Sequence, residues 1–431
     1  MPVFSKEARR EEAYLDLLHR SADMPVIDGH EHMPSEAKRL KKNVAFSDLF
    51  AHYCPGDMIA GGMTRADHAF IYDENGDVGA RWARFDPFYQ RIKNGGYARA
   101  ARIAMARFYG CDDLRCEADA IEVTRRMREA NRPGLYQTVF RDACHLEHSM
   151  VFTNEEMELG FFQHVWVMEH FLILSAHDSL EKLTGDIGGP YADLASYEAA
   201  LRRFVEDKVR TTGIRGIKFP TAYWRDLDFT PPAPGEAEAV YRRVYEAPSE
   251  GHADAVPYGQ LRPLQNHLVH SFVRMAEEFD IPVVFHTGIQ AGNFHRLDDA
   301  RPERLHSLFE AHPDVRFNLL HVGLPWMNET ILLAKYFYNV YVDLAWVHAI
   351  SPELAKTFIK NYIDLAPCNK LTGFGGDYSV AEKVYGHLTL ARENIATALA
   401  ERVADGTLTM ADAARWQQAM LYDNPKELYR L

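Results

Sequence analysis

Short apolar runs rich in Val, Ile and Phe recur along the chain, and longer segments with helical periodicity separate them. This alternation is typical of βαβ units, which build a parallel sheet. Strands that are covered on both faces show nearly continuous hydrophobic runs, as these do. Eight strands with intervening helices predict an α/β protein with a closed (β/α)8 TIM barrel. The predicted strands are Pro25–Gly29, Ser149–Thr153, His164–Met168, Gly213–Phe219, Ile281–His286, Val315–His321, Asn339–Leu344 and Lys370–Gly375.

The segment between the first two predicted strands is far longer than a usual βα loop. It covers residues 33–147 and contains helical stretches rich in aromatic and basic residues, including Arg81, Trp82 and Arg84. The active sites of barrel enzymes lie at the carboxyl ends of the strands, where such an insertion would sit. We therefore expect one domain over residues 1–431, in which residues 33–147 form a helical cap that excludes water or shapes specificity. An oligomerisation element is the alternative, so a homo-oligomer stays open.

Composition and charge narrow the class of partner. The 431 residues include 48 Lys and Arg against 61 Asp and Glu, a net charge of −13, and 47% are hydrophobic. Phosphate backbones are bound by basic surfaces, so we do not expect nucleic acid as a partner. The longest apolar stretch, residues 165–176, contains Glu169 and His170 and is shorter than the roughly 20 residues of a membrane helix. Five cysteines without a Cys-x-x-Cys pair, and a charged N-terminal segment, favour a reducing cytoplasm.

The strongest chemical feature is a His-x-His pair, His30 and His32, at the end of the first predicted strand. Side chains two positions apart on a strand point to the same side, so both imidazoles could bind one ion. Later predicted strands also end in candidate ligands, namely His286, His321 and Asp377. A lone histidine at a strand end is more often structural, but several at one rim predict a divalent metal site. Imidazole and carboxylate ligands suit zinc best, with manganese and iron as alternatives.

Candidate substrate-binding residues follow the fourth and seventh predicted strands. Lys218 lies in an apolar strand, where a lysine is costly unless it is paired, so a functional role competes with a structural ion pair. Lys218 and Arg225 together could hold a substrate carboxylate, and Tyr223 could donate a hydrogen bond. Trp346 could line the pocket, with simple packing as the alternative. Arg81 of the insertion is a further candidate for contact with an anionic substrate.

These motifs resemble the amidohydrolase superfamily of metal-dependent barrels. The finer resemblance is to the amidohydrolase-2 group, which includes decarboxylases of the aminocarboxymuconate-semialdehyde type, and to the related uronate isomerases. The segments around Lys218 and His286, together with residues 366–371 and 421–429, are similar to the amidohydrolase domain fused to glutamine-synthetase-like proteins. The resemblance covers essentially the whole chain, including the long insertion.

The resemblance implies a metal held by His30, His32 and Asp377. It also implies a further ligand in His286, and it makes His321 either a ligand or a group that polarises the substrate. Asp377 would take a proton from metal-bound water. One ion is expected, although the strand-four lysine and both later histidines also match two-metal members, in which that lysine is carboxylated.

The same residues suggest a mechanism. A zinc-like ion lowers the pKa of bound water from about 15.7 to about 7, so attack at neutral pH needs only a nearby carboxylate such as Asp377. His321 and Lys218 could stabilise the oxyanion that develops. Our first expectation is therefore a metal-dependent hydrolase for a small, anionic, carboxylate-bearing molecule. The alternatives are aldose–ketose isomerisation of a uronate, decarboxylation of an aromatic or muconate-type acid, and a non-catalytic metal-binding scaffold.

Overall fold

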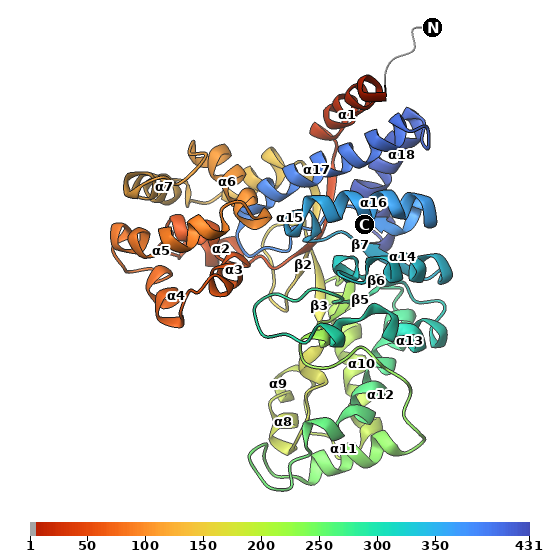
Figure 1. The fold of residues 1–431 in the computed structure, drawn as a ribbon. Coiled ribbons are helices and arrows are strands. Elements are labelled where there is room, and N and C mark those ends of the chain that lie inside the picture. The colour runs from red at the N-terminus through yellow and green to blue at the C-terminus, as the bar shows by residue number, and fades with distance from the viewer. Residues whose placement is uncertain (1–5) are drawn as a thin grey trace.

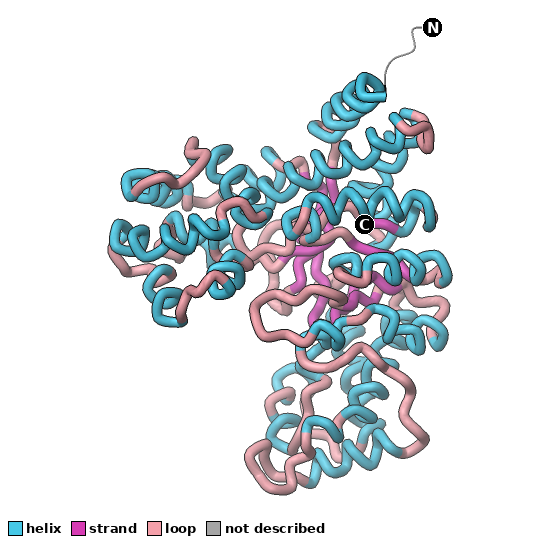
Figure 2. The backbone as a smooth tube through the Cα atoms, viewed as in Figure 1, coloured by secondary structure: helices cyan, strands magenta, loops and turns pink. Residues whose placement is uncertain are grey.

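The strands form one barrel-like sheet at the centre of the chain, and helices surround it (Figures 1 and 2). The computed structural model describes residues 6–431. Neighbouring strands pair in parallel and in chain order, from β1 to β8. The predicted α/β barrel is confirmed, and every observed strand overlaps a predicted one. The strands are β1 Val26–Glu31, β2 Leu146–Phe152, β3 Phe162–Val167, β4 Gly216–Phe219, β5 Val283–Phe285, β6 Phe317–Leu319, β7 Val340–Asp343 and β8 Leu371–Thr372.

The chain that follows β8 lies against β1 and brings the two edges of the sheet together. The backbone N–H of Asp377 donates to the carbonyl of His30 over 2.7 Å. Gly376 permits this approach, because a Cβ at that position would overlap the carboxylate of Glu31. The residues after β8 are therefore placed directly beside the His-x-His strand.

Helices cover the outside of the barrel, and α12 shows how the sequence pattern achieves this. Leu264, Leu268 and Phe272 recur at helical spacing, and all three are fully buried in one core cluster with Ile217 of β4. The helices outside the insertion are α1 Lys6–Ala22, α8 His177–Glu181, α9 Thr184–Ile187, α10 Leu194–Thr211, α11 Glu236–Glu246, α12 Arg262–Glu278, α13 His306–Ala311, α14 Met327–Tyr336, α15 Val347–Ile350, α16 Pro352–Leu365, α17 Ala381–Ala404, α18 Met410–Gln418 and α19 Asn424–Tyr429.

The insertion between β1 and β2 is helical, as predicted. It forms a body at one side of the barrel, drawn in red and orange in Figure 1. Its core contains Phe46, Phe85 and Met105, and Val380, which precedes α17, belongs to the same cluster. The insertion therefore packs on the start of α17. Its helices are α2 Glu36–Leu40, α3 Cys54–Ala60, α4 Arg65–Ile71, α5 Val78–Ile92, α6 Gly96–Tyr109 and α7 Glu117–Ala130.

The five cysteines are free thiols, of which Cys54 and Cys144 are buried. Within residues 6–431, no helix has both the length and the apolar character needed to cross a bilayer.

Candidate metal centre

The structure brings three of the predicted ligands together. The Nε2 atoms of His30 and His32 lie 3.2 Å apart, and each lies 3.2 Å from Oδ1 of Asp377. Ligand atoms about 2.0–2.1 Å from one tetrahedral ion lie about 3.3 Å from each other. The triangle of nitrogen and oxygen atoms thus has the size of one face of a zinc coordination sphere. Among residues 6–431, these three form the group of His, Cys, Asp and Glu side chains whose spacing suits a metal ion.

The electrostatics of the three residues also suit a cation. Burial lowers the pKa of His30 well below its usual value, so this imidazole is neutral and offers a lone pair. Burial alone would raise the pKa of Asp377, but the charges and hydrogen bonds of the neighbouring imidazoles outweigh it and hold that pKa well below its usual range. A neutral imidazole and an ionised carboxylate are the forms that bind a divalent ion. The side chain of His32 is 42% exposed, which leaves one side of the group open to substrate.

His321 and His286 stand next to this group. His321 Nδ1 donates to the Ala345 carbonyl over 2.9 Å, and His286 Nε2 donates to the Ile289 carbonyl over 2.8 Å. Because a carbonyl can only accept, each ring presents a lone pair on its other nitrogen, and these nitrogens lie 3.2 Å apart. His321 Nε2 is also 3.6 Å from Oδ2 of Asp377. His286 lies outside the group of three, and its role as a ligand stays a prediction.

Lys218 is buried in β4, as its apolar surroundings suggest. Its ammonium group lies 5.2 Å from the centre of the Phe152 ring, and that ring is 3.9 Å from the ring of His30. Burial lowers the pKa of Lys218 to about 7, although the carboxylates of Asp377 and Asp343 oppose the shift. The lysine is therefore placed in the barrel beside the metal group, with a charge that is easily lost.

Tyr53 of the insertion reaches the centre, and sequence reasoning missed it. Burial, together with the adjacent carboxylate of Asp377, raises the pKa of Tyr53 well above its usual value. Its ring stacks on Trp346 with centroids 4.3 Å apart, and the preceding His52 has its ring 6.1 Å from that of His32. No local motif marks these residues, because they lie in the short loop that precedes α3.

Trp346 lies beside the metal group, and its role in substrate binding stays a prediction. Its ring centroid is 5.2 Å from that of His321, and the residue is 2% exposed. Its indole N–H is buried and has no hydrogen-bond acceptor among residues 6–431. Its backbone is in the left-handed region with φ 71°, as are those of His321 (φ 62°) and Asp377 (φ 61°). Each such residue costs about 1–3 kcal/mol, and strain of this kind gathers at functional sites.

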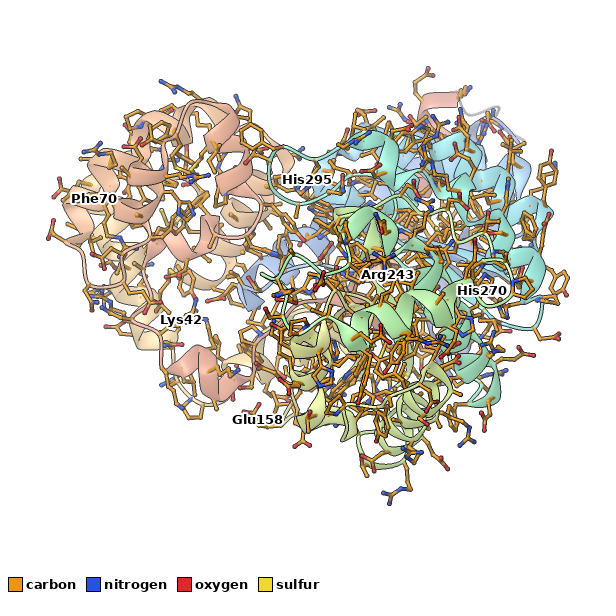
Figure 3. All side chains as sticks on the ribbon, turned by 90° about the horizontal axis from the view of Figure 1, so that it is seen from below. Lys42, Phe70, Glu158, Arg243, His270 and His295 are labelled. Carbon is orange, nitrogen blue, oxygen red and sulfur yellow. The ribbon has the colours of Figure 1, made fainter. Side chains whose placement is uncertain are left out.

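Tyr223 also lies at the site, on the side of the loop after β5. Its ring centroid is 4.6 Å from that of His286, and its hydroxyl accepts a hydrogen bond from the N–H of Ala291 over 3.0 Å. The proton of the hydroxyl is left free to be donated to a ligand. The same loop contacts the insertion, because Asn293 Nδ2 donates to the Gly56 carbonyl over 3.2 Å. Figure 3 shows His295 of this loop on the side of the barrel that faces the insertion.

The two predicted arginines are engaged elsewhere. Arg225 donates to the carbonyls of Asp226 and Asp228 and to Gln265, all in its own neighbourhood. Arg81 is buried inside the insertion, where it donates to the Ile71 carbonyl over 2.7 Å and to Ser47. These contacts give both guanidinium groups structural partners. The pairing of Lys218 with Arg225 around a substrate carboxylate stays a prediction.

Two further buried carboxyl groups lie beneath the metal group, on β1. Asp28 Oδ1 accepts from the N–H groups of His30 and Gly376, and Glu31 Oε2 accepts from the N–H of Tyr378. Burial raises the pKa of Asp28 to about 7 and that of Glu31 well above its usual value. These carboxyl groups fix the backbone of the ligand-bearing segments and are not themselves among the three grouped ligands.

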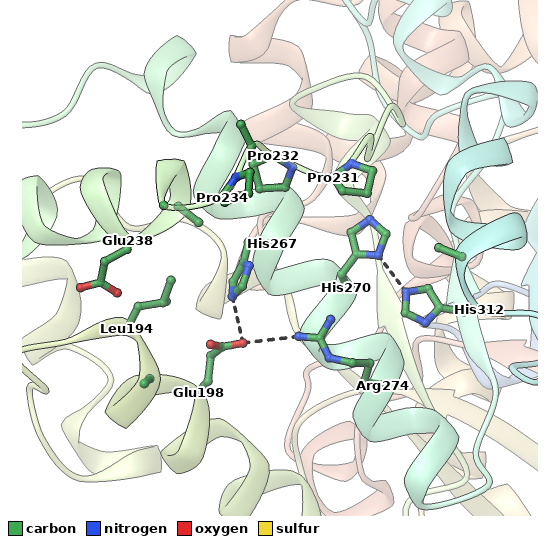
Figure 4. Close-up of a pocket in the computed structure, with 15 residues that line it drawn as sticks. Leu194, Glu198, Pro231, Pro232, Pro234, Glu238, His267, His270, Arg274 and His312 are labelled. Atoms are coloured by element: carbon green, nitrogen blue, oxygen red, sulfur yellow. Dashed lines mark hydrogen bonds and ion pairs between the residues drawn. The ribbon is translucent and has the colours of Figure 1, made fainter.

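A separate hollow of about 540 Å³ lies on the outer wall, between α10, α11 and α12. Its polar side chains pair with one another, since His270 Nδ1 is 2.8 Å from His312 Nε2 and His267 is 3.0 Å from Glu198 (Figure 4). None of its lining residues is one of the predicted site residues. The chemistry predicted from the sequence therefore gathers at the barrel mouth and not in this hollow.

Comparison with known proteins places the chain in a family. A family model described as amidohydrolase matches residues 188–431, which carry β4 to β8. Protein fluG of Emericella nidulans is 24% identical over 261 residues, or 57% of this chain. The matched region is 30% of that protein's length, so this chain corresponds to a minor part of it.

Two solved structures share the fold over nearly the whole chain. The uronate isomerase of Thermotoga maritima is 15% identical, with a TM-score of 0.78 and 97% of each chain covered. The glucuronate isomerase of Caulobacter crescentus is 16% identical, with a TM-score of 0.78, and covers 100% of this chain and 96% of its own. The coverage includes the helical insertion. At these identities the likeness concerns the fold alone.

Proposed function

The chain belongs to the amidohydrolase family. From that premise, we propose that it is a metal-dependent isomerase, which interconverts the aldose and ketose forms of a small uronate-like acid. The observation that carries the proposal is the position of Tyr53, which the insertion brings beside Asp377 at the metal group. Shared fold over the whole length, insertion included, with two sugar-acid isomerases supports it. This choice favours the isomerase alternative over our first expectation of a hydrolase.

Isomerisation moves a proton between neighbouring carbon atoms, so it needs a group that accepts a proton and one that donates. The low pKa of Asp377 keeps it ionised, and the raised pKa of Tyr53 keeps its phenol protonated at neutral pH. The carboxylate would accept the proton while the phenol donates to a substrate oxygen.

The remaining residues would bind and orient the substrate. A divalent ion held by His30, His32 and Asp377 would supply Lewis-acid stabilisation of a substrate oxygen. The Lys218 ammonium group would attract the carboxylate of the substrate. The unpartnered indole N–H of Trp346 would donate to a substrate hydroxyl, because a buried donor without an acceptor costs about 1–3 kcal/mol.

The direct test is to incubate protein loaded with zinc, manganese or iron with D-glucuronate and D-galacturonate in D2O. The proposal expects a ketose product and deuterium at C2 of the recovered aldose, and Asp377→Asn is the inactive control. If neither sugar acid changes or takes up deuterium with any of the three metals, the proposal is wrong. N-acyl amino acids, lactones and aromatic acids in the same panel would then reveal hydrolysis or decarboxylation.

A further inference from the structure

The first turn of α17 carries two fully buried charged residues whose partners belong to the insertion. The ammonium group of Lys383 donates to the backbone carbonyls of Ala51 and His52 over 3.0 and 2.9 Å. It also lies 4.4 Å from the centre of the Tyr378 ring. Neither Lys383 nor its neighbour Glu382 takes part in the chemistry described above.

Glu382 makes the second connection to the insertion. Its Oε1 accepts a hydrogen bond from Arg39 over 2.8 Å and another from the Tyr109 hydroxyl over 2.6 Å. Arg39 also donates to Asn131, so the ion pair joins both ends of the insertion to α17. This buried ion pair and its neighbouring hydrogen bonds therefore tie the insertion to the first turn of α17.

The backbone that Lys383 holds is strained. His52 and Tyr53 are consecutive residues in the left-handed region, with φ values of 56° and 79°. Non-glycine residues are rarely found in this region because it is energetically costly, so the turn persists only where its surroundings impose it. The hydrogen bonds from Lys383 to the carbonyls of residues 51 and 52 hold the turn in this conformation. This conformation places Tyr53 beside Asp377 and stacks its ring on Trp346.

A buried ammonium group is an expensive way to stabilise a fold. Removal of a lysine from water carries a large desolvation cost, and an apolar side chain of similar length would fill the same space without that cost. What the ammonium group adds is a pair of directed hydrogen bonds that an apolar side chain cannot make. The benefit of Lys383 therefore lies in the conformation of the turn.

We propose that Lys383 is a positioning residue, which holds the His52–Tyr53 turn of the insertion in place at the metal group. Lys383 and Asp377 belong to one short segment, residues 377–383. We therefore expect that a metal ion bound at Asp377 also stabilises the conformation of the His52–Tyr53 turn. The part that Tyr53 plays in turnover rests on the proposed function. The coupling does not, because it is a statement about the conformation of this chain.

The test is hydrogen–deuterium exchange of the full chain, with peptides that cover residues 46–60, in the presence and absence of zinc. The variant Lys383→Met keeps the apolar stem and removes both hydrogen bonds. Lys370→Met is the matched control, because Lys370 is also buried and donates to two carbonyls, those of Ala334 and Phe337, outside the insertion. Zinc content and thermal stability are measured for each protein.

We expect exchange in residues 46–60 to be at least tenfold faster in Lys383→Met than in the wild type, with zinc still bound and peptides from β4 to β6 unchanged. Removal of zinc should speed exchange of the same peptides in the wild type. Lys370→Met should lose thermal stability without this local change. If Lys383→Met fails to fold, Lys383→Gln, whose shorter side chain cannot reach both carbonyls, should show the same local increase.

The proposal is overturned if residues 46–60 exchange at the wild-type rate in the folded Lys383→Met variant, or in Lys383→Gln when the former does not fold. Indifference of these peptides to zinc in the wild type would also overturn the coupling. Lys383→Met could instead lose exchange protection over the whole barrel, to the same extent as Lys370→Met. That result would show that Lys383 only stabilises the fold, and it would overturn the proposal. None of these readouts depends on which reaction the protein catalyses.

Discussion

The ring of Tyr53 stacks on the ring of Trp346 with centroids 4.3 Å apart, so a residue of the insertion and a residue of the loop after β7 form one wall of the metal centre. Trp346 in turn contacts His321, whose Nε2 is 3.6 Å from the carboxylate of Asp377. The insertion is thus a part of the site and not only a cover above it. Its contribution can be tested one residue at a time.

Tyr53→Phe should lower kcat by about 10²-fold or more, because it removes a proton donor while it keeps the stacked ring. Zinc content and thermal stability should stay at the wild-type values. Steady-state kinetics and metal analysis check both parts. Tyr97→Phe is the control, since Tyr97 also stacks on Trp346, at 6.0 Å. An equal loss in both variants would contradict a specific role for the Tyr53 phenol.

Lys218→Met should raise thermal stability while turnover falls. The ammonium group is buried, and burial lowers its pKa to about 7. Replacing such a charge with an apolar side chain of similar volume typically stabilises a protein by about 1–4 kcal/mol. Thermal unfolding and steady-state kinetics are the measurements. A variant that is less stable yet fully active would assign Lys218 to the structure alone.

Arg81→Met should lower the free energy of unfolding by about 2 kcal/mol, because it leaves the Ile71 carbonyl and the Ser47 hydroxyl without their buried donor. KM for the substrate should not change. Denaturant unfolding and kinetics test the two statements separately. A tenfold rise in KM with unchanged stability would restore the substrate-binding role expected from the sequence.

Stability should fall in acid through the buried His348. Burial lowers the pKa of His348 from 6.5 to about 4, although its hydrogen bond to the Gly373 carbonyl opposes the shift. The unfolded chain then binds a proton that the folded chain does not, so stability is complete above pH 6.5 and is lost as pH falls toward 4. The loss from this group is about 3 kcal/mol at pH 4.

The measurement is denaturant unfolding of metal-free protein at several pH values, which excludes loss of the metal as a cause. His348→Gln keeps a donor for Gly373 and cannot titrate, so its stability should depend less steeply on pH between 6.5 and 4. Curves for the two proteins that stay parallel over this range would contradict the assignment.

The order and type of the barrel strands followed from the sequence, but their ends did not. β2 begins at Leu146, three residues before the predicted start, because Glu147 and His148 are polar and only half-buried, which hides the strand pattern. β8 is limited to Leu371–Thr372, since the glycines after it leave the ladder and approach β1 instead. A hydrophobic pattern shows which residues are buried, whereas hydrogen bonding between neighbouring strands ends where the backbone turns away.

For the site, sequence reasoning found the residues that lie at strand ends. His30, His32 and Asp377 could be predicted, because barrel topology alone brings the carboxyl ends of the strands together. Tyr53 could not, since its place depends on a strained turn of the insertion and on tertiary contacts. Arg81 and Arg225 were chosen for their charge, and charge does not reveal whether a guanidinium group already has partners.

The central claim is that His30, His32 and Asp377 hold one divalent ion, and anomalous X-ray scattering at the zinc edge from zinc-loaded crystals tests it most directly. The account predicts one strong peak about 2.0–2.2 Å from Nε2 of His30, Nε2 of His32 and Oδ1 of Asp377. A peak bound elsewhere, for example between His286 and His321 alone, with none at the His-x-His pair, would contradict it.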